Sequence, residues 1–150
     1  DVDGLEPRFY VDIGKIGFLD LDELGTDVAA MGTTALGPCS ALVSVSSRKL
    51  GLCHYDGSVC GGNVSAVFQR MDEELYGPIE HYVIPGVVKN KKYSTSGEVT
   101  KSHKALNNYD AILDEHLALF EDQTVPNPDS AVVLIIFKLD DAQIYYNTTS

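Results

Sequence analysis

The order of the predicted elements indicates an α+β protein in which about two to three helices flank a largely antiparallel β-sheet. Three observations lead to this prediction. Short β-branched and apolar runs dominate both ends of the chain, two segments between them have helical spacing, and no internal repeat is present. The 150 residues suit one domain, so we expect residues 1–150 to form a single catalytic domain.

The N-terminal region predicts two strands and an acidic segment. Residues Arg8–Ile13 and Ile16–Leu19 are strand-like and are joined by a Gly14-Lys15 turn, which predicts an opening β-meander. The acidic segment Asp20–Asp27 suits either a short capped helix or a solvated loop, and its charge favours the loop.

A β-hairpin is expected next. The apolar runs Ala41–Val45 and Leu50–His54 flank a polar tetrad that is typical of a short hairpin loop. Centring the turn in this tetrad pairs Ala41 with His54, and it places Cys39 on the same face, diagonally across from His54. Diagonal Cβ atoms lie ~7–8 Å apart, within reach of a thiol and an imidazole, whereas a slip of one residue would turn His54 to the opposite face.

A helix and a strand are predicted after the hairpin. Asn63 is a suitable N-cap for a helix over Val64–Tyr76, whose apolar residues form one stripe. Residues Ile79–Val88 predict a strand that bends at Pro85-Gly86.

The C-terminal half predicts a long helix and a final hairpin. Apolar residues recur at three- and four-residue intervals over Thr100–Glu121, which predicts the longest helix. Strand-like runs at Ala131–Leu139 and Gln143–Tyr146 follow, separated by two aspartates.

The composition narrows the classes of partner. The formal net charge of −11 argues against nucleic acid and anionic membrane as ligands, because both bind to clustered Lys and Arg. It favours a basic protein as the partner. The simpler interpretation of the charge, taken alone, is that it keeps the protein soluble. No apolar run approaches the ~20 residues that cross a bilayer, so we expect no membrane insertion. His81, His103 and His116 lack metal-site spacing, and we expect neither metal nor cofactor.

The cysteines indicate a reducing compartment. Cys53 and Cys60 could form a disulfide. The simpler interpretation is that all three thiols are free and that Cys39 is available for chemistry. The chain begins without Met or a signal segment, which we interpret as processing or excision from a longer chain.

Cys39 and His54 are candidates for a nucleophile and its base. A thiolate is the working nucleophile, and an imidazole held by a third group can take the thiol proton. The competing interpretation is that Cys39 is a small buried apolar residue and His54 a strand residue packed in the core, and spacing alone favours it.

Backbone donors near Cys39 could bind an oxyanion. Pro38 has no N–H, so the donors must come from Gly37, Cys39, Ser40 or another loop. Asp56 would lie opposite Cys39 at the open end of the hairpin and could orient the imidazole or a substrate amide, although capping of the following turn is favoured.

A motif around this hairpin supports the nucleophile hypothesis. It consists of Thr33-x-x-Leu36-Gly37-x-Cys39-x-Ala41, followed by Gly51 and His54. The motif resembles the active-site segment of the CheD chemoreceptor glutamine deamidases, a superfamily that also includes Burkholderia lethal factor and the catalytic domain of cytotoxic necrotizing factors. The resemblance covers a small part of the chain.

The resemblance implies deamidation of a glutamine on a target protein. It implies Cys39 as the nucleophile, His54 as the general base and acid, and Thr33 as the residue that orients the imidazole, with Thr34 as an alternative to Thr33. It also implies a β-sandwich-like core flanked by helices and a reaction without a cofactor.

The resemblance also implies a biological setting. CheD-type proteins carry a small residue where this chain has Pro38, and their later glycine-rich segment is not found, so the toxin branch fits better. We therefore expect a bacterial toxin or effector that is secreted or delivered into the cytoplasm of a host or target cell, with the bacterial cytoplasm as the alternative.

Several chemical alternatives stay open at this point. An amine in place of water would give transglutamination by the same steps. A thiol peptidase could use the same Cys-His pair. A non-enzymatic acidic binding module, such as an immunity or inhibitor protein, would need neither residue.

Overall fold

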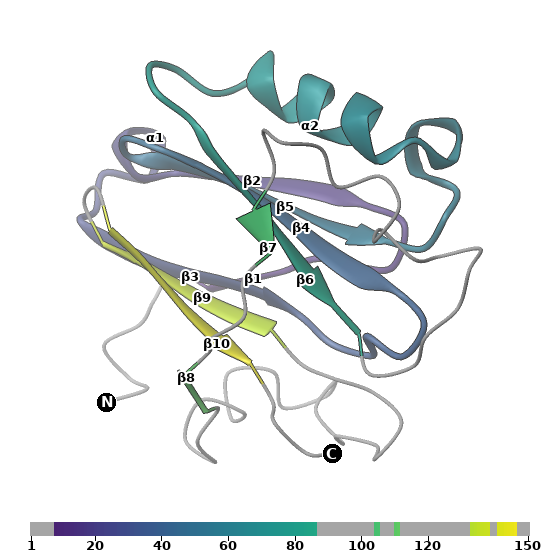
Figure 1. Ribbon diagram of the computed structural model, residues 1–150. Coiled ribbons are helices and arrows are strands. Elements are labelled where there is room, and N and C mark those ends of the chain that lie inside the picture. The colour runs from purple at the N-terminus through teal and green to yellow at the C-terminus, as the bar shows by residue number, and fades with distance from the viewer. Residues whose placement is uncertain (1–7, 87–103, 106–109, 112–132, 139–140, 147–150) are drawn as a thin grey trace.

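Two five-stranded sheets stack face to face, and a helix covers the outer side of one of them (Figure 1). The structure is a computed structural model that describes residues 8–86, 104–105, 110–111, 133–138 and 141–146. Most strand pairs are antiparallel, and three are parallel: β1–β3, β8–β10 and β6–β7. The predicted α+β class and its largely antiparallel sheets are confirmed.

We call the two layers the β3 sheet and the β5 sheet. In spatial order, the β3 sheet contains β1 (Arg8–Tyr10), β3 (Val28–Thr33), β9 (Val133–Lys138), β10 (Asp141–Tyr146) and β8 (Asp110–Ala111). The β5 sheet contains β2 (Ile16–Asp20), β5 (Lys49–Tyr55), β4 (Ser40–Ser46), β6 (Glu80–Pro85) and β7 (Lys104–Ala105). The helical segments are α1 (Leu21–Leu24), the 3₁₀ segment η2 (Val59–Gly62) and α2 (Val64–Asp72).

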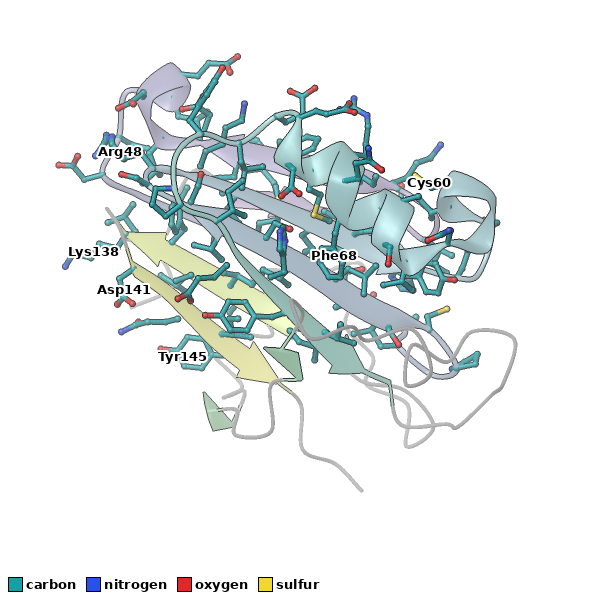
Figure 2. All side chains as sticks on the ribbon, turned by 45° about the horizontal axis from the view of Figure 1, so that its top comes forward. Arg48, Cys60, Phe68, Lys138, Asp141 and Tyr145 are labelled. Atoms are coloured by element: carbon teal, nitrogen blue, oxygen red, sulfur yellow. The ribbon has the colours of Figure 1, made fainter. Side chains whose placement is uncertain are left out.

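The β5 sheet is apolar on both faces because alternate residues of its strands point to different cores. On β4, Ala41 and Val43 enter the core between the two sheets, whereas Leu42 enters the core under α2. Figure 2 shows Phe68 pointing from α2 toward the sheet, where it belongs to the second core. The site described below lies in the first core.

The predicted hairpin has the predicted register. Strands β4 and β5 pair Ala41 with His54 and Val45 with Leu50, across the two-residue turn Ser47-Arg48. The final hairpin is also confirmed, because β9 and β10 pair along their whole lengths.

Helix α2 begins as predicted and ends early. The Asn63 side chain accepts a hydrogen bond from the Ala66 N–H at 3.0 Å, as an N-cap does. The helix ends at Asp72 rather than Tyr76, although Leu75 beyond its end is still buried.

The N-terminal region differs from the predictions in three ways. Strands β1 and β2 form no meander, because β1 joins β3 and β2 joins β5 in the other sheet. The acidic segment contains α1, whose N-cap Asp20 accepts from two backbone N–H groups. Strand β3 was not predicted, since its sequence Val-Ala-Ala-Met-Gly-Thr is rich in small residues and lacks alternation.

The predicted helix over Thr100–Glu121 is contradicted where the structure describes it. Residues Lys104–Ala105 and Asp110–Ala111 are strands at sheet edges. The other residues of this predicted helix lie outside the described ranges. Within those ranges, no helix is long and apolar enough to cross a membrane.

Candidate active site

A hydrogen bond between Thr33 and His54 joins the two sheets in the buried core. Thr33 is the last residue of β3, and its Oγ1 lies 2.7 Å from His54 Nδ1 on β5. The same hydroxyl donates to the Val11 carbonyl oxygen at 2.7 Å. A hydroxyl has one hydrogen, so Thr33 must accept from Nδ1–H. This network assigns the neutral tautomer in which His54 Nε2 carries the lone pair.

His54 Nε2 is buried and has no hydrogen-bond partner among the described residues. His54 is completely shielded from solvent, and an unsatisfied buried acceptor costs about 1–3 kcal/mol. Buried polar atoms of this kind are rare in folded proteins and often mark a functional site. The lone pair is therefore available to a proton donor that enters or moves into the core.

Cys39 lies on the same face as His54, directly before β4. Its exposed fraction is 8%, and it belongs to the core between the sheets together with Ala41, the cross-strand partner of His54. The backbone of His54 bonds to Lys15 and Gly14, on the side away from β4. Ala41 and His54 thus form a non-hydrogen-bonded pair, the kind with the closer side chains.

The thiol and the imidazole are neighbours without a hydrogen bond in this structure. Cys39 lies two positions before Ala41, so Cys39 is the diagonal neighbour of His54, at a typical separation of ~7–8 Å. Sγ and Nε2 must come closer before a proton can pass between them, by rotation of the Cys39 side chain or by a shift of its loop. Catalytic hydrogen bonds are often long before substrate binds.

The electrostatic surroundings keep both groups neutral at rest. Burial, followed by the negative charge of Asp56, raises the pKa of the Cys39 thiol. Burial lowers the pKa of His54 to about 4, against the opposing effects of Asp56 and Asp12. The resting pair is a thiol and an imidazole, so His54 would act as a base only when the thiol attacks.

The structure distinguishes the two candidate threonines. Thr34 Oγ1 lies 2.8 Å from the Tyr10 hydroxyl, away from the imidazole, whereas Thr33 bonds to His54. Both threonines are buried. Of the two threonines, only Thr33 is in position to orient His54.

Asp56 caps a turn, as the sequence favours. Its Oδ1 accepts from the Ser58 N–H at 2.9 Å and from the Ser58 hydroxyl at 2.5 Å. These bonds lower the pKa of Asp56, so its negative charge persists beside the site. Its influence on Cys39 and His54 is electrostatic.

The loop before Cys39 turns three carbonyl groups in one direction. The oxygens of Leu36, Gly37 and Cys39 all point at Gly86, directly after β6. The Leu36 carbonyl and the Gly37 N–H belong to the same trans peptide group, in which the C=O and the N–H point in opposite directions. The Gly37 N–H therefore points away from Gly86. Ser40 N–H points toward β5, where Ser40 pairs with Tyr55. The Gly37 N–H is therefore better placed than the Ser40 N–H to be free for an oxyanion.

A second constellation that the sequence did not predict lies under α2. Ser44 Oγ is 2.7 Å from His81 Nδ1, and His81 Nε2 is 2.9 Å from Asp72 Oδ1. The residue types are those of a serine hydrolase triad, but Ser44 is completely buried and cannot meet a substrate. The chain of bonds instead fastens the C-terminal end of α2 to β4 and β6.

The remaining thiols have different surroundings. All three cysteines are free; Cys53 is buried, and burial raises its pKa to about 12. Cys60 is exposed and lies in η2, beside α2 (Figure 2). Among the described residues, no group of His, Cys, Asp or Glu is arranged to hold a metal ion.

Comparison with protein-family models and with curated protein sequences gives no match to this chain.

Proposed function

We propose that this chain is a cysteine-dependent protein-glutamine deamidase. The observation that carries the proposal is the Thr33–His54 bond, because it fixes the imidazole tautomer in which Nε2, the nitrogen not bound to Thr33, can take a proton. A structural histidine in a core would satisfy both ring nitrogens, yet Nε2 has no partner in the described part of the chain and Cys39 lies on the same face.

The reaction begins when the Cys39 thiol gives its proton to His54 Nε2. Sγ attacks the side-chain carbonyl carbon of a glutamine, and the tetrahedral intermediate carries a negative oxygen. The imidazolium returns the proton to the nitrogen, ammonia leaves, and a thioester links Cys39 to the substrate. His54 then takes a proton from water, the resulting hydroxide attacks the thioester, and glutamate and the thiol are released.

Backbone donors would stabilise the negative oxygen. The N–H groups of Cys39 and Gly37 are the candidates, since Pro38 has none and the Ser40 N–H points toward β5. Burial, followed by the negative charge of Asp56, disfavours a resting thiolate, which limits side reactions of the thiol in the absence of substrate.

The substrate of this proposal is a protein that presents a reactive glutamine. We propose a bacterial toxin or effector that acts after secretion, or after delivery into a host or target cell. The net charge of −11 favours a basic target surface. An amine in place of water would give transglutamination through the same thioester.

The test is mass spectrometry of bacterial and eukaryotic lysates treated with the protein, with Cys39→Ser as the inactive variant and Cys60→Ser as the matched control. We expect a gain of about one dalton at one glutamine of one target, produced by the wild type and by Cys60→Ser only. New peptide termini would instead indicate a peptidase. Identical lysates for wild type and Cys39→Ser would overturn the proposal and favour a binding module.

A further inference from the structure

The contact between Gly86 and the loop Ala35–Cys39, which we call the Cys39 loop, is unusually close. A Cβ added at Gly86 would lie 2.3 Å from the carbonyl oxygens of both Cys39 and Gly37, and 2.6 Å from that of Leu36. All three atoms belong to the backbone, so no side-chain rotation relieves the overlap. Residue 86 must be glycine for the loop to have this shape.

The requirement for glycine is one of space and not of backbone conformation. Gly86 is absent from the glycines with positive φ among the described residues, so an alanine there could adopt the same backbone angles. Its hydrogen in the Cβ direction points at the three oxygens, a geometry in which weak Cα–H···O contacts form. Continuing the β4–β6 register by one residue places Gly86 opposite Cys39.

The other end of the loop is also constrained. Ala35 has a left-handed backbone with φ 61°, which is costly for a residue other than glycine. Leu36 follows it and is completely buried in the core between the sheets. The Cys39 loop is therefore held at its start by Leu36 and along its length by Gly86.

We infer that Gly86 is a positioning residue for Cys39. This inference rests on the proposed function and extends it to a residue on another strand. The missing side chain lets the carbonyls of the loop close onto the end of β6, which keeps Cys39 diagonal to His54 and turns the Gly37 N–H away from β6. A methyl group at residue 86 would push the loop and its thiol away from the imidazole.

The test is a double-mutant cycle on the rate at which iodoacetamide alkylates Cys39, followed by peptide mass spectrometry. In the wild type, His54→Ala should slow alkylation of Cys39 by about 100-fold, the typical effect of losing a general base. In the Gly86→Ala background, we expect His54→Ala to change that rate by less than about 3-fold. Cys60 serves as the exposed internal reference in every sample.

A control variant separates the contact from the loss of a glycine. Nothing lies within 4 Å of a Cβ added at Gly77, so Gly77→Ala makes no such contact, although the φ of +73° there strains its own backbone. It should leave the effect of His54→Ala on Cys39 unchanged. Circular dichroism and thermal unfolding establish that each variant is folded at the temperature of the assay.

Each outcome has a distinct meaning. An equal effect of His54→Ala with glycine or alanine at residue 86 would overturn the positioning role and leave the deamidase proposal intact. No effect of His54→Ala in the wild type would overturn the Cys-His pair itself. If Gly86→Ala does not fold, NMR of the wild type decides: the two Gly86 Hα shifts should differ and should move when Cys39 is alkylated. Equal, unmoved shifts would contradict the inference.

Discussion

One hydroxyl, that of Thr33, decides the chemical state of the candidate base. It donates to a backbone carbonyl of the β1–β2 connection and accepts from His54 on the opposite sheet, so the imidazole tautomer depends on the stacking of the two layers. Orienting groups of this kind affect rate through geometry and protonation, without touching the substrate.

Replacing Thr33 should therefore lower the activity more than the stability. Thr33→Val leaves Nδ1–H without its acceptor, and we expect glutamine turnover to fall on the order of 10- to 100-fold. Thr33→Ser keeps the hydroxyl and should retain most of the activity. Thr34→Val is the matched control, because it loses only the bond to Tyr10. Equal losses for Thr33→Val and Thr34→Val in the deamidation assay would contradict the role of Thr33.

At the scale of elements, the β4–β5 hairpin could be predicted because the residues that determine it are close together in the sequence. A polar turn between two apolar runs fixed the register, and with it the shared face of Cys39 and His54. Thr33 could not be reached this way, because β3 pairs with β9, whose partner residues lie about a hundred positions later. The motif resemblance alone suggested Thr33.

The same contrast explains what the sequence did not predict under α2. Ser44, His81 and Asp72 come from three elements, and their spacing along the chain does not predict that they are in contact. The stripe of α2 predicted a helix on the sheet, but not which polar groups would fasten its end.

Removing this fastening should destabilise the protein without affecting the site between the sheets. His81→Ala leaves the buried Ser44 hydroxyl unpaired and releases Asp72, and we expect a loss of about 1–3 kcal/mol in the free energy of unfolding. Urea denaturation measures this loss. Alkylation of Cys39 should keep its wild-type rate in native buffer, and a slower rate would show that the two sites are coupled.

At the scale of the whole molecule, the sandwich explains why the site is dry and neutral. The β5 sheet separates two apolar cores, and the candidate pair lies in the one between the layers. The α+β class could be predicted from the mixture of apolar runs and helical stripes. The division of strands between two layers could not, since β1 and β2 are adjacent in sequence and lie in different sheets.

Burying a neutral histidine makes the stability of this fold depend on pH. The pKa of His54 is lowered to about 4 in the folded state from 6.5, so between these values the unfolded chain binds the proton that the folded chain excludes. Stability is then fully present above pH 6.5 and falls as the pH drops toward 4, by about 3 kcal/mol from this residue. Asp56 has a lowered pKa, and its own contribution is lost only below its ordinary value of 3.8.

Urea denaturation of the wild type and of His54→Gln at pH 7 and pH 4 isolates this contribution. Glutamine does not titrate and its amide can still donate to Thr33, so the variant should lose less stability on acidification than the wild type. The other histidines are common to both proteins and cancel in the difference. Parallel losses in the two proteins would mean that His54 can become charged inside the fold, and the neutral base in the proposed mechanism would then have to be replaced by an imidazolium paired with the Cys39 thiolate.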